Sequence, residues 1–318
     1  MLKLICSALY RYLHSRFLYI SAALFTVSAV VFALYIRSRN GLSIYTFLAQ
    51  NVILSILISI TVSGEFCGCA KNKIICGHGR MKTFFSELLS AYIVVSAFFL
   101  INTALSAVLN TGFVSRLPVL LAFEVAAGFY LISLSLCSVF VFFSSIGSRK
   151  VLSVVLCVVF VFVSVIANGI IEDLLRQPEY LIFYVSDKED KNVSENGIVY
   201  EQDPGELTEI KQKNPEYIGG AARVIILQLY KANPFYDIVQ YQNILTPYIY
   251  SDEKIHEMSA VYSPGDPGYD NPTYRMRFVR EETEEEQRFL YEAPLYGLTV
   301  LILSVAAGAL VFRKKKYS

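Results

Sequence analysis

The chain has 318 residues, of which 54% are hydrophobic and 17% are charged, and its formal net charge is +1. This composition is too apolar for an ordinary soluble protein of that length, which excludes a simple globular domain. The apolar residues gather into stretches of about 20 residues, the length that an α-helix needs to cross the hydrocarbon core of a bilayer. The sequence therefore predicts a polytopic membrane protein.

Residues 1–16 are expected to form an interfacial helix. The apolar side chains of Leu2, Ile5, Leu9 and Leu13 recur at helical spacing, and most basic residues of the segment lie off that stripe. This pattern is typical of a short amphipathic helix that lies in the membrane interface. A plain basic tail is the simpler alternative.

Six apolar stretches predict membrane-spanning helices. They cover Phe17–Ile36, Leu42–Ser63, Phe84–Leu109, Leu117–Ile146, Val151–Ile171 and Leu295–Phe312. Residues 17–171 thus hold spans one to five, and residues 293–312 hold span six. The fold class that we expect for this part of the chain is an all-α polytopic membrane domain of six transmembrane helices.

Basic residues in the short loops indicate how the helices cross the membrane, because cytoplasmic loops carry an excess of Lys and Arg. With the N-terminus inside, thirteen Lys and Arg residues fall on inner segments, and only Arg37, Arg39 and Arg116 fall on the two short outer loops. We therefore expect both termini in the cytoplasm, with residues 313–318 as a basic cytoplasmic tail.

The inner segment 64–82, GEFCGCAKNKIICGHGRMK, connects the second and third spans. Its Cys67, Cys69, Cys76 and His78 could act as soft metal ligands. However, one residue separates each pair, whereas two to four separate the paired ligands of structural zinc sites. The simplest interpretation is an inner loop whose cysteines share no role, and we assign no metal site.

A third interpretation explains more of this segment. It resembles the first cytoplasmic loop of the permease subunits of ABC transporters of the type-2 exporter class. In that family a Glu ends the second span, and small residues, a Lys-Asn step, a short helix and Gly-x-x-Arg follow. The matching residues here are Glu65, Gly68 to Ala70, Lys71-Asn72 and Gly77-His78-Gly79-Arg80. The chain departs from the family at Gly79, where Ser often stands, and at Glu87, where Lys often stands.

The resemblance implies that this loop contains a coupling helix, which docks into a groove on a separate ATPase subunit. The coupling residues that it implies are Glu65, Lys71, Asn72, Gly77, Gly79 and Arg80. The basic side chains of Lys71, Lys73, Arg80 and Lys82 can pair with acidic groups on that partner. In the simpler case they pair with anionic lipid.

For the whole chain, the resemblance implies a membrane-spanning permease subunit that exports a peptide, an antibiotic or another amphipathic compound. The expected partners are a dimer of an ABC ATPase subunit and a second permease half, identical or homologous, within the lipid bilayer. No nucleic-acid partner is expected. The chain has no G-x-x-x-x-G-K-[ST] loop, so ATP and Mg would bind the partner ATPase. We expect no directly bound cofactor and no enzyme activity of the chain's own.

Four polar residues within the expected spans are candidates for the translocation path, because such side chains usually face a cavity, a partner or the interface. They are Gln50, Asn51, Asn102 and Glu124. For the three amides, hydrogen bonding between helices is the simpler alternative. Glu124 would lie at the outer interface if the fourth span begins late.

Residues 172–292 separate the fifth and sixth spans and hold 24 of the 27 acidic residues but only 12 of the 28 basic ones. The orientation above places this acidic segment outside. It is long enough to fold, and we expect an inserted mixed α/β extracellular domain. Strands are predicted at Tyr180–Ser186 and Tyr274–Arg280, and a helix at Ala221–Leu245 with a break near Pro234.

The run EETEEEQ at residues 281–287 is expected to be a solvated helical face that leads into span six. Residues 172–292 contain no cysteine, which favours a bacterial cell surface, of the Gram-positive type, over an animal one. The negative charge of this segment suits the capture of cationic antimicrobial peptides. The alternative, from a different functional class, is a membrane-anchored receptor or sensor whose acidic outer domain binds a ligand.

Overall fold

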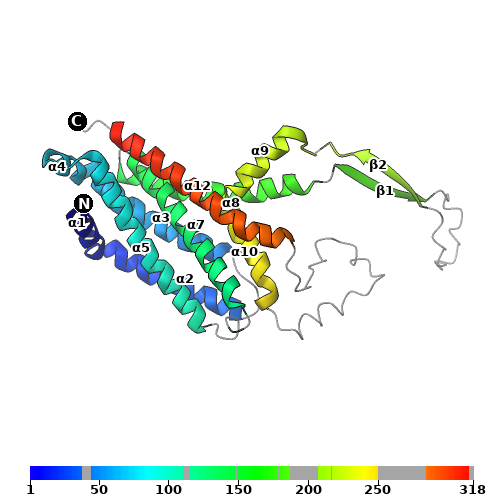
Figure 1. Cartoon of the computed structure of the whole chain (residues 1–318), viewed down its shortest axis with the longest axis horizontal. Coiled ribbons are helices and arrows are strands. Elements are labelled where there is room, and N and C mark those ends of the chain that lie inside the picture. The colour runs from blue at the N-terminus through cyan, green and yellow to red at the C-terminus, as the bar shows by residue number, and fades with distance from the viewer. Residues whose placement is uncertain are drawn as a thin grey trace, which may run out of the picture. The chain divides into compact units, whose positions relative to one another are not determined.

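The computed structural model of the chain describes residues 1–37, 44–109, 115, 117–147, 149–177, 179–186, 207–215, 217–249 and 284–314 (Figure 1). These residues are mostly helical, and those in strands form a two-stranded sheet. They divide into two compact units, a bundle unit, Met1–Val165 with Lys231–Ser318, and a hairpin unit, Ile166–Tyr230.

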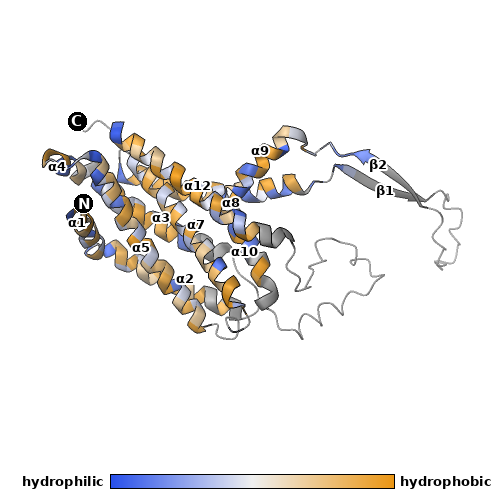
Figure 2. Cartoon of the chain, in the orientation of Figure 1, coloured by the Kyte–Doolittle hydropathy of each residue, from blue (hydrophilic) through white to orange (hydrophobic). Residues whose placement is uncertain are grey.

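The described part of the bundle unit is built from helices. In chain order they are α1 (Leu2–Leu13), α2 (Arg16–Arg37), α3 (Ile44–Gly64), the π-helical turn η1 (Glu65–Cys69), α4 (Ala70–Ile75), α5 (Arg80–Leu109), α7 (Val119–Ile146), the first part of α8 (Lys150–Arg176), α10 (Pro234–Ile249) and α12 (Glu284–Lys314). Each of the six apolar stretches that predict spans falls on a different long helix. Figure 2 shows that these helices are mostly hydrophobic along their length.

Four of the described helices are long and apolar enough to cross a membrane. They are α5, α7, the Lys150–Leu175 part of α8 and the Phe289–Lys314 part of α12. The number rises to five if α1 and the Arg16–Val31 part of α2, which are bent by 67° from each other, count as one span. In α3 the apolar part Ala49–Gly64 is shorter than a span. The multi-pass character is thus supported, and six spans stay a prediction.

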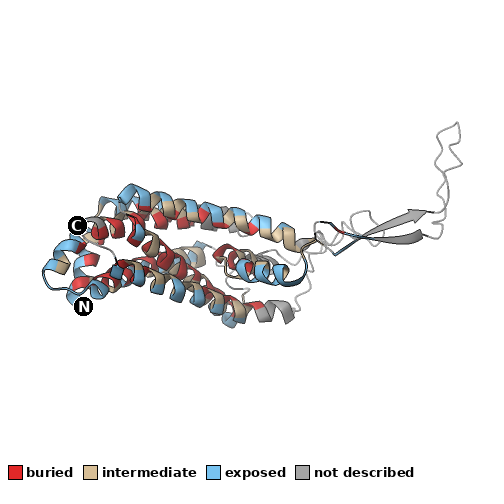
Figure 3. Ribbon diagram, turned by 90° about the horizontal axis from the view of Figure 1, so that it is seen from above, coloured by how far each residue is buried: buried red, intermediate tan, exposed pale blue. Residues whose placement is uncertain are grey.

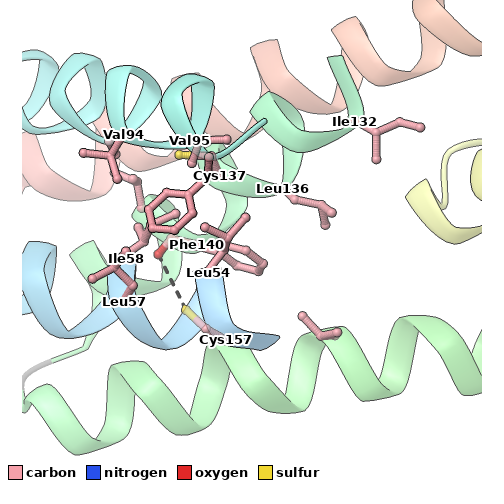
Figure 4. Close-up of a cluster of buried hydrophobic side chains, with 14 of the residues drawn as sticks. Leu54, Leu57, Ile58, Val94, Val95, Ile132, Leu136, Cys137, Phe140 and Cys157 are labelled. Carbon is pink, nitrogen blue, oxygen red and sulfur yellow. Dashed lines mark hydrogen bonds between the residues drawn. The ribbon is translucent and has the colours of Figure 1, made fainter. Parts of the chain in front are cut away.

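Helix α7 forms the centre of the bundle unit. It is 56% buried over its most apolar stretch, compared with 17–22% for α5, α8 and α12, and it packs against α3, α5 and α12. Leu136 and Phe140 of α7 lie in one buried cluster with Leu57 and Ile58 of α3 (Figure 4). Many outward-facing side chains of the other long helices are exposed (Figure 3), as on helices that face lipid.

Helix α1 is present where the sequence predicts a helix, and it packs against α5. Leu4, Ala8 and Tyr12, spaced four residues apart, are its buried side chains. Leu2 and Leu13 of the predicted apolar stripe are 76% and 57% exposed. These two side chains are therefore free to contact lipid, and the interfacial position of α1 stays a prediction.

The hairpin unit contains the end of α8, the strands β1 (Tyr180–Ser186) and β2 (Leu207–Lys213), and α9 (Gly220–Lys231) up to Tyr230. The strands pair antiparallel, from Tyr180 opposite Lys213 to Ser186 opposite Leu207. The predicted strand at 180–186 is confirmed with the same bounds. The predicted strand at 274–280 lies outside the described residues.

The predicted helix at 221–245 is confirmed, together with its break. Helix α9 ends at Lys231, and α10 begins at Pro234, since proline suits the first position of a helix. The side chain of Asn233 caps α10 by accepting a hydrogen bond from the Phe235 N–H at 3.1 Å. Helix α10 belongs to the bundle unit and packs against α7 and α12. The described part of segment 172–292 is thus shared between the two units.

Candidate functional site

The loop that resembles a coupling element is largely helical. Helix α3 continues through η1 into α4, so that one helical run extends from Ile44 to Ile75. Within η1 the N–H of Ala70 donates to the carbonyl of Glu65, five residues back. Such π-turns insert one extra residue into a helix and are frequent at functional sites.

The helical run ends in a hydrogen-bonded cap. The N–H of His78 donates to the carbonyl of Lys73, and the N–H of Gly77 to that of Ile74, both at 3.0 Å. Gly77 has a φ of +88°, the left-handed conformation that this Schellman motif requires and that glycine adopts without strain. The predicted coupling residue Gly77 thus has a definite backbone role, which is to end α4.

Four charged side chains meet at the base of α4, each from a different element. Arg11 of α1 contacts Glu65 of η1, and its Nη2 lies 2.6 Å from Oε1 of Glu87 on α5. Nζ of Lys73 on α4 lies 2.8 Å from Oε1 of Glu65 and 3.4 Å from Oε1 of Glu87. Each cation therefore contacts both carboxylates. We call Arg11, Glu65, Lys73 and Glu87 the charge cluster.

The carboxylates of the charge cluster are fully buried, whereas Arg11 is 30% and Lys73 15% exposed. Burial of a carboxylate is costly unless the charge is paired, and here two cations balance two anions. Outside segment 172–292 the chain has just three acidic residues, and the structure brings two of them, Glu65 and Glu87, together. The charge cluster therefore ties α4 to α1 and α5.

The phenylalanine of η1 anchors the same region through apolar contacts. Phe66 is 1% exposed. Its ring centroid lies 4.6 Å from that of Phe312 on α12 and 6.2 Å from that of Phe84 on α5. These contacts hold the base of α4 against two of the long helices.

The outer surface of the loop carries basic and apolar side chains. Lys71, Asn72, His78 and Lys82 are exposed, and Ile75 is 72% exposed. The acidic residue of segment 64–82, Glu65, is buried in the charge cluster. This surface therefore presents positive charge around the exposed side chain of Ile75.

The structure separates the six predicted coupling residues into two groups. Glu65 is buried, so its place in the charge cluster gives it a positioning role inside the chain. Lys71, Asn72, Gly77 and Gly79 lie on the exposed surface. Arg80 is exposed too, and its Nη1 donates to the carbonyl of Arg313 near the end of α12 at 2.9 Å.

Sequence reasoning missed the role of Arg11 and Glu87. Glu87 stands out in the sequence, because a carboxylate near the start of an apolar span needs a cation. Nothing in the sequence identifies Arg11 as one of its partners. Lys73, expected to face a partner protein or lipid, pairs within the chain instead.

Three of the four candidate metal ligands of the loop, Cys69, Cys76 and His78, have side chains that the structure describes. Cys69, Cys76 and His78 are exposed. Among the described side chains, no group of three or more His, Cys, Asp or Glu is close enough to hold a metal ion.

The polar residues proposed for a translocation path occupy different settings. Gln50 and Asn51 are buried, at 4% and 3% exposure. Nε2 of Gln50 donates to Oδ1 of Asn102 at 3.2 Å and so connects α3 to α5, which is the helix-to-helix bond weighed as the simpler alternative. Glu124 is half-buried on α7, one helical turn before Gly128.

A second buried polar group lies where α10 packs on α7. Tyr241 is 1% exposed and Asp237 is 3% exposed. The Tyr241 hydroxyl and Oδ1 of Asp237 have no hydrogen-bond partner among the described residues. Burial raises the pKa of Asp237 well above its usual range. Burial, with the carboxylates of Asp237 and Glu124, raises the pKa of Tyr241 as well.

No family model, curated protein or solved structure matches the chain. What the site does must therefore be inferred from its own residues.

Proposed function

We propose that this chain is the membrane-spanning permease subunit of an ABC transporter, and that α4 is its coupling helix. The observation that carries the proposal is the setting of α4. This short helix continues a long apolar helix, and on its inner side Lys73 pairs with Glu87 of α5 and with Glu65, which in turn pairs with Arg11 of α1. Its outer side exposes Lys71, Asn72 and Ile75.

Such a setting suits the transfer of a push from a partner protein. Because α3, η1 and α4 form one helical run, a displacement of α4 is carried into α3 and is not absorbed by a flexible loop. The exposed basic side chains favour a partner surface with acidic groups. The side chain of Ile75 would fill an apolar pocket on that surface, in the manner of a central anchor residue.

In this proposal the chain forms half of a transporter's membrane core, and the other half is identical or homologous. A dimer of ATPase subunits binds ATP and Mg. The chain lies in the plasma membrane of a Gram-positive bacterium, with residues 172–292 outside. It exports a peptide, an antibiotic or another amphipathic compound and contributes to resistance against antimicrobial peptides. The loop motif and the charge of segment 172–292 support these assignments.

The test is to purify the tagged full-length chain from its native membrane in mild detergent. We expect a nucleotide-binding subunit of roughly 25–35 kDa, the size of one domain or slightly more, to co-purify with it. The variants Lys71→Glu and Ile75→Glu alter exposed side chains outside the charge cluster. Each should lower recovery of this subunit on the order of tenfold, which corresponds to about 1.4 kcal/mol of lost affinity.

Lys213→Glu is the matched control, because it makes the same charge change at an exposed position on β2. We expect it to leave recovery unchanged. Equal recovery with Lys71→Glu and Lys213→Glu would contradict a docking role for α4, and the absence of any nucleotide-binding protein would contradict the proposal as a whole.

A further inference from the structure

We infer that Arg11 of α1 is a positioning residue for α4, so that α1 and α4 respond to each other through the charge cluster. The consequence for ATP-driven transport rests on the proposed function. The link between α1 and α4 through the charge cluster does not rest on that function, because it follows from contacts within the chain.

The link runs through shared carboxylates. Glu65 contacts Arg11 through Oε2 and Lys73 through Oε1, so its side chain bridges α1 and α4. Oε1 of Glu87 lies near both Arg11 Nη2 and Lys73 Nζ, at 2.6 and 3.4 Å. Neither cation can leave without changing the charge balance around the other.

Removal of the Arg11 charge would leave two buried carboxylates with one ammonium between them. The repulsion between Glu65 and Glu87 would then be only half compensated, and both carboxylates are buried from water. Since Glu65 is the first residue of η1, the strain falls on the π-turn from which α4 begins. We therefore expect the turn and α4 to loosen together.

Lysine is not equivalent to arginine at this position. The guanidinium of Arg11 reaches Glu65 with Nη1 and Glu87 with Nη2, and a single ammonium cannot reproduce this fork. Arg11→Lys keeps the positive charge but cannot contact both carboxylates. This variant therefore tests the geometry of the contact separately from its charge.

Helix α1 is placed to transmit a signal of its own. Ala8 and Tyr12 are fully buried, and the helix packs on α5, while Leu2, Tyr10 and Leu13 are exposed on its outer side. A change in how this outer side meets the membrane would shift Arg11, and the charge cluster would pass the shift to α4.

The test is hydrogen–deuterium exchange on the full-length chain in lipid nanodiscs. Arg11→Gln should raise amide exchange across residues 65–75 by about tenfold or more, because local opening sets the exchange rate. Arg11→Lys should give a smaller rise in the same segment. Arg16→Gln removes one charge from an exposed position on the neighbouring helix and serves as the control, with no change in residues 65–75.

The double variant Arg11→Gln, Glu87→Gln provides the decisive comparison. It restores neutrality and leaves the close Lys73–Glu65 pair intact, so residues 70–75 should return to wild-type exchange while α1 stays loosened. If amide exchange across residues 65–75 is equally slow in Arg11→Gln and in Arg16→Gln, Arg11 does not position α4. Failure of the double variant to restore α4 would also overturn the inference.

Co-purification separates this inference from the proposed function. If no ATPase subunit binds the wild-type chain, the permease assignment fails. The hydrogen–deuterium exchange results still decide whether Arg11 positions α4. If an ATPase binds, Arg11→Lys should keep it bound and lower the rate of ATP hydrolysis by the complex in lipid nanodiscs. An unchanged rate would contradict a role of Arg11 in coupling.

Discussion

The ring of Tyr241 on α10 lies directly over Gly128 on α7. A Cβ atom at position 128 would overlap the hydroxyl oxygen and Cζ of Tyr241, so only glycine lets the two helices approach this closely. The ring also contacts Phe129 and Phe289, with centroids 5.1 Å away in each case. This arrangement holds α10 in the bundle unit.

Gly128→Ala should therefore destabilise the protein. The added methyl group has no space, and overpacking of a tight contact costs about 1–3 kcal/mol. We expect a lower unfolding temperature in detergent, measured by the fluorescence of a thiol-reactive dye or by circular dichroism. Gly169→Ala on α8 is the control, because a Cβ there meets nothing within 4 Å. It should be neutral or stabilising, and an equal loss in both variants would contradict the close approach.

Tyr241→Phe should leave stability unchanged or raise it by about 1 kcal/mol. The hydroxyl is buried without a hydrogen-bond partner in the described structure, so its removal saves a desolvation cost and breaks no bond. The ring contacts with Phe129 and Phe289 remain. The same unfolding assay tests this expectation. A loss of more than about 1 kcal/mol would mean that the hydroxyl is bonded in the protein.

The stability of the folded protein should depend on pH through the buried carboxyl group of Asp237. Burial raises its folded-state pKa above the unfolded value, so the folded protein retains a proton that the unfolded chain releases. Stability therefore falls as pH rises from the ordinary Asp range through the folded-state pKa. Asp237→Asn removes this dependence. The unfolding temperature of Asp237→Asn should exceed that of the wild type only slightly at about pH 4. The difference should grow with pH until the folded-state pKa of Asp237 is passed.

Asp173→Asn supplies the control for this titration, because Asp173 is exposed on α8. The difference in unfolding temperature between Asp237→Asn and Asp173→Asn at each pH then isolates the effect of burial at position 237. A constant offset between Asp237→Asn and the wild type across the pH range would show that folding does not raise the pKa of Asp237.

Glu65→Gln should destabilise the protein through the charge cluster. It leaves Arg11 and Lys73 with the single carboxylate of Glu87. Loss of one partner of a buried pair costs about 3 kcal/mol, here at the lower end because both cations are partly exposed. Urea or thermal unfolding would measure the loss. Glu179→Gln alters an exposed carboxylate and should have little effect, so similar losses in the two variants would contradict the pairing.

Cysteine labelling tests the proposed orientation. Cys76 is exposed beside α4, whereas Cys137 and Cys157 are buried. In a variant whose only cysteine is Cys76, a membrane-impermeant maleimide should react in inside-out vesicles and not in intact cells. Lys213→Cys in a cysteine-free background should show the opposite pattern. Labelling of Cys76 from outside would reverse the topology.

Much of the helical framework could be predicted from the sequence, because length and hydropathy are local properties of a segment. Six apolar stretches coincide with helices, and the strand at Tyr180–Ser186 was predicted with its bounds. The break before Pro234 was readable from one residue, since proline favours the first turn of a helix over its interior. Strand β2, LTEIKQK, was missed because its residues alternate poorly, and its pairing with β1 decides its structure.

The charge cluster and the docking of α10 depend on tertiary structure. Glu65 was recognised from its loop, whereas its burial against Arg11, 54 positions earlier in the chain, could not be read from the loop. That pairing exists because α1 packs against α5. In the same way, the sequence shows Gly128 only as one small residue in an apolar span. Its role follows from the packing of Tyr241 of α10 over it. Hydropathy is a property of each segment by itself. The partner of a buried charge, and the side chain that packs against a glycine, depend on which segments pack together.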